Sequence, residues 1–197
     1  EIAQCLVGSE MCIRDRIYGV VIGVLLSFVS VVIKASVPPR GFLGVIPGQN
    51  GFYDMERNRN AHMIKGAVIY RFSGTLFFAN INVFVRDIEN AVTPDIKLVI
   101  VDASGIGSID ITAADRLVIM ADKLKNRGVR FYLTEHVGYV NDLLRKLGAG
   151  ELIDIGAVRR TISLALRDSG IVRPYPLEDR DGVSPMETVL ERIDELA

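Results

Sequence analysis

The stretch that decides the fold is Val99–Ala113, which reads VIVDASGIGSIDITA. Three β-branched apolar residues come first, a short turn rich in Gly and Ser follows, and Asp110 then precedes a run with helical spacing. This order predicts a buried strand, a turn and the start of a helix. Such a turn can bind an anion, because the first amides of a helix lack partners, or it can be a plain connection.

Strands and helices are expected to alternate on both sides of this stretch. Strands are predicted at Ala67–Phe72, Leu98–Val101, Val129–Leu133 and Leu152–Ile153. Helices are predicted at 81–92, 111–127 and 137–147. A last helix is predicted to be capped by Asp154 and to end at Gly170. Ser73–Gly74 is predicted to turn the first strand into a hairpin with Leu76–Phe78. The pattern predicts an α/β domain over 66–170, with a mostly parallel sheet, an antiparallel edge hairpin and about four helices.

An uncharged apolar run precedes this domain. Residues 17–37 are predicted to form a transmembrane helix, since about 17–25 apolar residues cross a bilayer. A signal peptide and a buried core helix are the alternatives, and 34–39 makes a poor signal cleavage site. Lys34 and Arg40 follow the uncharged run. The positive-inside tendency therefore predicts a protein of the cell or inner membrane whose α/β domain lies in the cytoplasm. Small residues recur along one face of the helix, at Gly19, Gly23, Ser27 and Ser30. Such a face suits packing against further membrane helices.

Three other segments complete the organisation of the chain. Met11–Arg16 matches the translation of a transposase adaptor used in sequencing libraries, so 1–16 is interpreted as non-native; a loop before the span is the alternative. Residues 38–65 are predicted to be a linker. Residues 171–197 are predicted to be a tail whose prolines keep it extended and whose Ser184 and Glu187 begin a short helix. That helix either docks on its own domain or binds a partner.

The composition excludes several classes of function. A net charge of -1 gives no basic surface for nucleic acid. Cys5 and Cys12 both precede the apolar run, so the domain has neither a disulfide framework nor a thiolate metal site. His62 and His136 are isolated, and no phosphate loop with its lysine is present. We therefore expect no metal, no cofactor and no enzyme activity.

The turn itself is the candidate site. Asp102 and Asp110 flank it, and carboxylates at such positions are more often turn and cap residues than an acid–base pair. Asp110 is a good N-cap, and Thr112 with Asp115 offers a second capping choice. The residues predicted to form a turn that binds a nucleotide or a partner are Asp102, Ser104, Gly105, Gly107, Ser108, Asp110 and Thr112.

At this turn the sequence resembles a family. VDASGI (101–106) and IDITA (109–113) look like the signature of STAS domains, which are shared by anti-sigma-factor antagonists and the cytoplasmic ends of SulP (SLC26-like) anion transporters. Other pieces are similar to the transporter branch: GVVIGVLLS (19–27), GVIPG (44–48) with Tyr53-Asp54, and LFFAN (76–80). The resemblance covers Ile17 to about Gly170.

The resemblance implies a STAS domain that regulates a sulfate or bicarbonate transporter, following its last membrane helix. The expected partners are the membrane, the rest of the transporter's membrane domain, a protein at the 102–112 turn and a second copy in a homodimer. In the antagonist branch a serine at the helix start is phosphorylated, and Thr112 matches that acceptor position. Ile111 and Ala113 depart from the Asp-Ser-Ser-Gly pattern. There are two alternatives to a transporter domain. One is an antagonist-like phospho-switch that binds a kinase-like partner, and the other is a nucleotide-sensing module.

Overall fold

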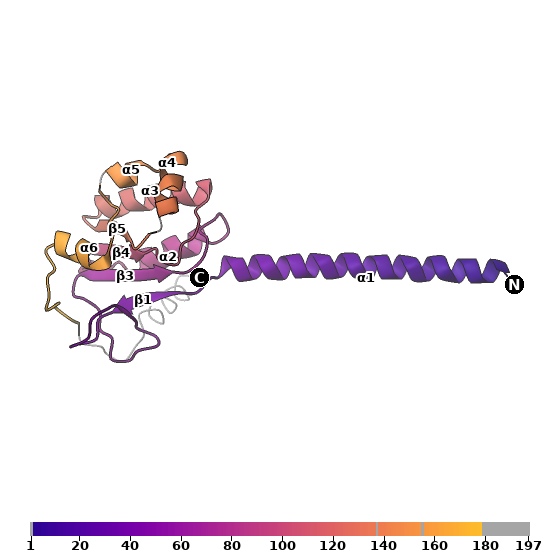
Figure 1. Cartoon of the computed structure of the whole chain (residues 1–197), viewed down its shortest axis with the longest axis horizontal. Helices are drawn as coiled ribbons and strands as arrows, with labels where there is room; N and C mark the ends of the chain where they lie inside the picture. Colours follow the sequence, from indigo (N-terminus) through magenta and orange to yellow (C-terminus); the bar gives the residue numbers. More distant parts are fainter. Residues whose placement is uncertain (1, 137, 155, 179–197) are drawn as a thin grey trace. The chain divides into compact units, whose positions relative to one another are not determined.

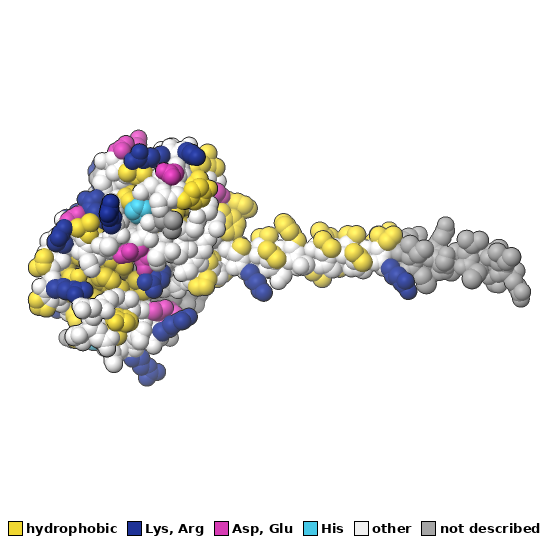
Figure 2. Space-filling model, in the orientation of Figure 1, with side chains coloured by type: hydrophobic (Ala, Val, Ile, Leu, Met, Phe, Trp, Pro, Cys, Tyr) yellow, Lys and Arg dark blue, Asp and Glu magenta, His cyan; other side chains and the backbone are white. Residues whose placement is uncertain are grey.

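The computed structural model describes residues 2–136, 138–154 and 156–178, which divide into two units after Val37. The first unit is one helix, α1 (Ile2–Ser36), so residues 2–16 are helical and do not form the loop considered above. Its part from Arg16 to Ser36 is long and apolar enough to cross a membrane. Figure 2 shows hydrophobic side chains along it, as a helix surrounded by lipid requires.

The second unit is built on one mixed sheet (Figure 1). In its described part five strands lie in the order β2-β1-β3-β4-β5. Strands β3, β4 and β5 are parallel, whereas β1 pairs antiparallel with both β3 and β2. The α/β prediction with an antiparallel edge is therefore confirmed. The bounds are β1 (Arg40–Gly44), β2 (Tyr53–Asp54), β3 (Ala67–Phe72), β4 (Leu98–Asp102) and β5 (Arg130–Thr134).

The antiparallel edge comes from a different segment than expected. Residues 38–65, expected to be a linker, supply β1 and β2, and β1 is the antiparallel neighbour of β3. The predicted hairpin of β3 with Leu76–Phe78 is wrong, because Leu76 instead forms a parallel bridge with Ile109. The backbone at Ser73–Gly74 does not fold back on β3, since Ser73 N–H donates to Pro39 and Gly74 N–H donates to Gly105, both at 2.9 Å.

Helices cover both faces of the sheet. One face packs through Val68, Tyr70, Val99 and Val101 against α2 (Ile81–Ala91) and α3 (Ile111–Asn126). The residues between them, such as Ile69 and Ile100, pack on the other face against α6 (Ile162–Asp168). Strands buried on both faces explain the near-continuous apolar runs in β3 and β4. The remaining helices are α4 (Gly138–Lys146) and α5 (Glu151–Asp154).

The end of the domain differs from the sequence expectation. Leu152–Ile153, predicted to be a strand, lies in α5, where Ile153 and Asp154 donate to the carbonyl of Gly150. Val158 takes the place of that strand through a parallel bridge to Leu133. The last helix begins at Ile162 and is capped by the Thr161 hydroxyl, not by Asp154. The predicted helix after Ser184 lies outside the described residues.

A buried carboxylate ties the first strand to the core. Asp87 of α2 is 1% exposed and accepts hydrogen bonds from Arg40 Nε at 2.6 Å and Tyr70 Oη at 2.8 Å. Arg40 opens β1, and Tyr70 lies in β3. Burial and the Asp87 carboxylate raise the pKa of Tyr70 above its ordinary value, so the phenol stays protonated and keeps donating.

Replacing Asp87 by alanine tests this arrangement. Asp87→Ala leaves the buried hydroxyl of Tyr70 and the guanidinium of Arg40, whose side chain is 18% exposed, without their acceptor. Breaking a buried pair in this way costs about 3–5 kcal/mol of unfolding free energy. Glu89→Ala on the same helix removes an exposed pair with Lys123 and should cost less than about 1 kcal/mol. Chemical denaturation of both variants in detergent micelles measures the difference, and equal losses would contradict the assignment.

Candidate functional site: the turn after strand β4

Asp102 organises the start of the turn. Its side chain is 1% exposed, and one oxygen accepts a 2.7 Å hydrogen bond from Arg71 Nε at the end of β3. The other oxygen accepts from the backbone N–H of Ser104 at 2.9 Å, which closes a short turn. Both oxygens are thus engaged in holding the backbone. Because it is also buried, Asp102 is a structural residue.

The loop after β3 runs alongside the turn, with hydrogen bonds at each step. Besides the Gly74–Gly105 bond, Leu76 N–H donates to Ser108 and Asp110 N–H donates to Leu76, both at 3.0 Å. The two segments approach each other tightly at Gly105. A Cβ there would lie 2.8 Å from Ser73 Cα and 3.0 Å from the Phe72 carbonyl. Only glycine leaves room for this approach.

Asp110 completes the turn and begins α3. One carboxylate oxygen accepts from Ala113 N–H at 2.7 Å, which confirms the predicted N-cap. The other oxygen accepts from the N–H of Phe78 at 3.0 Å, so the same carboxylate holds the neighbouring loop. A phosphate at this helix start would compete with a carboxylate that is already in place. The geometry therefore favours a rigid connection over a nucleotide site.

The structure brings the predicted residues together but gives them different environments. Ser104, Gly107 and Thr112 are exposed, whereas Gly105, Ser108 and Asp110 are partly covered. Thr112 lies in the first turn of α3, on the solvent side. Two apolar residues at the turn, Phe78 and Ile111, were not among the predicted site residues and are 66% and 59% exposed. Helical spacing alone would not have found Ile111, because it lies three residues before Ala114 and seven before Val118 of the predicted apolar stripe.

The arrangement offers a contact surface. Among the described residues no three His, Cys, Asp or Glu side chains gather in a way that could hold a metal ion. The histidines have separate local partners: His62 Nδ1 lies 3.1 Å from the Glu178 carbonyl and His136 Nε2 lies 2.8 Å from Asn141 Nδ2. Burial lowers the pKa of His136, which keeps it neutral at pH 7. We define the exposed side chains of Phe78, Ile111 and Thr112 as the turn surface.

Two glycines of the turn provide a matched test. Gly105→Ala forces the loop at Ser73 away from the turn, because the new Cβ overlaps backbone atoms. Overpacking of this kind costs about 1–3 kcal/mol. Gly107→Ala places its Cβ in open space, with no atom within 4 Å, and should leave stability within about 0.5 kcal/mol. Thermal unfolding of both variants measures the difference; a stable Gly105→Ala would contradict the close approach.

Comparison with known proteins agrees with the geometry. The STAS domain family matches residues 58–165. A probable sulfate transporter of Mycobacterium tuberculosis is 30% identical over 140 residues, which cover 70% of this chain and 24% of the transporter. Probable sulfate transporter 4.2 of Arabidopsis thaliana is 29% identical over 147 residues, covering 68% and 22%. The chain thus spans about a quarter of the length of these relatives.

A solved structure supports the same fold. The murine Solute Carrier 26 family member A9 anion transporter, in its inward-facing state, superposes with a TM-score of 0.70 at 20% identity, over 78% of this chain and 25% of the transporter. The resemblance seen in the sequence is therefore confirmed, and the apolar helix before the domain fits the C-terminal part of such a transporter. The chain belongs to the STAS domain family, and the relatives that it matches are sulfate transporters of the SulP/SLC26 type.

Proposed function

We propose that this chain is the last membrane helix and the cytoplasmic STAS domain of a SulP-type transporter of inorganic anions, in which the domain acts as a regulatory and interaction module. The observation that carries the proposal is the order of parts: an apolar helix ends at Ser36, and the STAS fold begins two residues later. The relatives matched over this region are sulfate transporters, so sulfate is the first anion to test and bicarbonate the second.

The membrane path for the anion would lie in other helices. One helix cannot surround an ion, because intramembrane binding sites are formed by several helices around a shielded centre. In this chain the described membrane segment is α1 alone. Lys34 in the last turn of that segment and Arg40 just after it support a cytoplasmic domain. Vesicles that hold only this chain should therefore pass no sulfate, and flux through them would contradict the proposal.

The turn surface is the proposed contact of the domain with the membrane part of the transporter. Its apolar side chains lie next to polar Thr112, a mixture typical of protein interfaces. The loop from Ser73 to Phe78 joins this surface to the first residues of the domain, since Ser73 donates to Pro39 and Phe78 donates to Asp110. The place where the chain enters the domain is thus bonded to the same loop that carries Phe78.

Polar substitution of the two apolar residues tests the contact. The double variant Phe78→Ser and Ile111→Ser should weaken docking about tenfold or more, as loss of central apolar contacts does. The readout is sulfate uptake by the full-length transporter in cells that lack their own uptake. Ile119→Ser, on the same helix and 49% exposed, is the control and should leave uptake unchanged. Unchanged uptake in the double variant, with normal folding, would contradict the role of this surface.

Thr112 supports a second function, a phosphorylation switch at the same surface. Its hydroxyl is exposed in the first turn of α3, where a phosphate gains from the helix dipole. Asp110 and Asp115 oppose that gain by repulsion. Thr112→Glu should then lower uptake several-fold, while the uncharged Thr112→Val should not. Ser163→Glu, in the first turn of α6, is the charge control; equal effects of Thr112→Glu and Ser163→Glu would exclude a local switch.

A further inference from the structure

Strand β5 is the outer parallel strand, and only part of its free edge is covered. Hydrogen-bonding groups alternate along a strand, and those of Arg130 point toward β4, as its N–H bond to Lys97 at 2.9 Å shows. The groups of Phe131, Leu133 and Glu135 consequently point away from β4. Leu133 and Glu135 find partners there in the segment Ala157–Arg160.

That segment shows how the edge binds an extended chain. Leu133 N–H donates to Ala157 at 2.8 Å, Arg159 N–H donates to the Leu133 carbonyl at 2.9 Å, and Glu135 N–H donates to Arg160 at 3.2 Å. Val158 makes a parallel bridge with Leu133. This pairing begins at Leu133. Phe131, two residues earlier on the same edge of β5, has no described strand beside it. The N–H and carbonyl of Phe131 therefore face a position where another extended chain fits.

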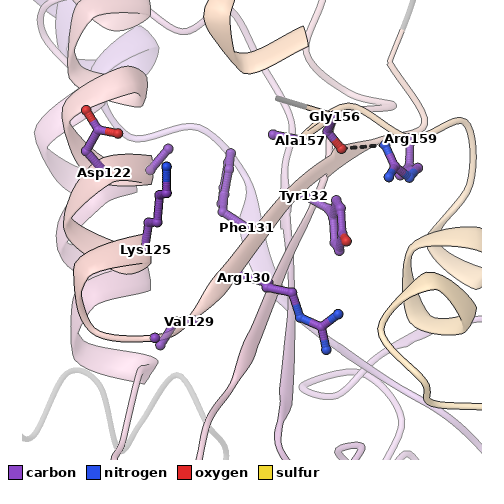
Figure 3. A pocket seen from close by; sticks show the side chains of 11 residues that line it. Asp122, Lys125, Val129, Arg130, Phe131, Tyr132, Gly156, Ala157 and Arg159 are labelled. Carbon is purple, nitrogen blue, oxygen red and sulfur yellow. Dashed lines mark hydrogen bonds between the residues drawn. The ribbon is translucent and has the colours of Figure 1, made fainter. Parts of the chain in front are cut away.

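A cavity of about 410 Å³ occupies that position. Figure 3 shows it between α3, β5 and the turn at Gly156, with the side chains of Phe131 and Tyr132 along the strand. Lys125 lies on the α3 side, and Arg130 and Arg159 on the other side, where both bond the end of α6. Lys125 forms no ion pair with any described residue. Asp122 is the one acidic side chain among the residues that line the cavity.

We propose that the open part of the β5 edge, at Phe131, binds an extended acidic segment of a partner protein by strand addition. Main-chain bonds to Phe131 supply the affinity. Lys125 and Arg130 select acidic side chains, together with Arg159, whose charge is shared with Asp168 at 2.7 Å. A second copy of this chain is disfavoured as the occupant. Two copies that pair through this edge would bring Lys125, Arg130 and Arg159 of each against the same cations of the other.

The probe is a fluorescent hexapeptide that alternates glutamate and valine, added to the full chain in detergent micelles. Anisotropy should show saturable binding to the wild-type chain. Lys125→Glu should weaken this binding at least tenfold, whereas Arg116→Glu, on the same helix but outside the cavity lining, should change it less than twofold. Equal effects of the two substitutions would overturn the site, since they would show attraction by net charge alone.

Two further measurements separate strand addition from simple charge attraction. In amide hydrogen exchange followed by NMR, the peptide should slow exchange at Phe131 at least tenfold. A peptide with alternate N-methylated amides should bind at least tenfold more weakly, because it lacks the donors needed for pairing. No protection at Phe131, or equal binding of the methylated peptide or of a lysine–valine peptide, would overturn the proposal. None of these readouts depends on anion transport.

Discussion

The buried Asp87 carboxylate is the interaction on which the arrangement of the domain depends. An unpaired charge in a protein interior is unstable, so Asp87 requires both Arg40 and Tyr70. Because Arg40 begins β1 and Tyr70 lies in β3, one side chain of α2 fixes the first strand of the domain to its core. A displacement of the chain at Arg40 would therefore act on α2 and on the sheet together. This suits a domain that follows a membrane helix.

Two more carboxylates, Asp102 and Asp110, join separate elements at the turn. Their structural role limits the functions that the turn can have. Asp102 joins the end of β3 to the turn, and Asp110 joins the start of α3 to the loop at Phe78. Each of these carboxylates is bonded by two donors of the fold, so both have a structural role at the turn. The turn presents to solvent a fixed backbone with the side chains of Ser104, Phe78, Ile111 and Thr112. Such preorganised surfaces favour binding of a partner over chemistry.

The sequence was sufficient for the elements with strong local signals. The β4–turn–α3 unit, its Asp110 cap and the parallel order follow from buried apolar runs and capping chemistry. The antiparallel edge was assigned to the wrong residues, because β1 is paired with β3 across more than twenty intervening residues that carry no periodic pattern. Leu152–Ile153 was too short to distinguish a strand from one helical turn. The position of Phe78 at the start of α3 depends on its bond to Asp110, a contact between segments distant in the sequence.

The cations at the β5 edge have two physical consequences that reinforce each other. Lys and Arg on an open edge discourage pairing with another copy of the same strand, a common protection against aggregation. The same charges lower the free energy of an acidic strand bound at that position. The side chains that repel a second copy of β5 are therefore the ones that attract an acidic partner. Arg130 and Arg159 are held in place by the end of α6, and this reduces the entropy lost when a ligand binds. If the domain forms a homodimer, the β5 edge is therefore a poor interface for it, and the contact must use another face.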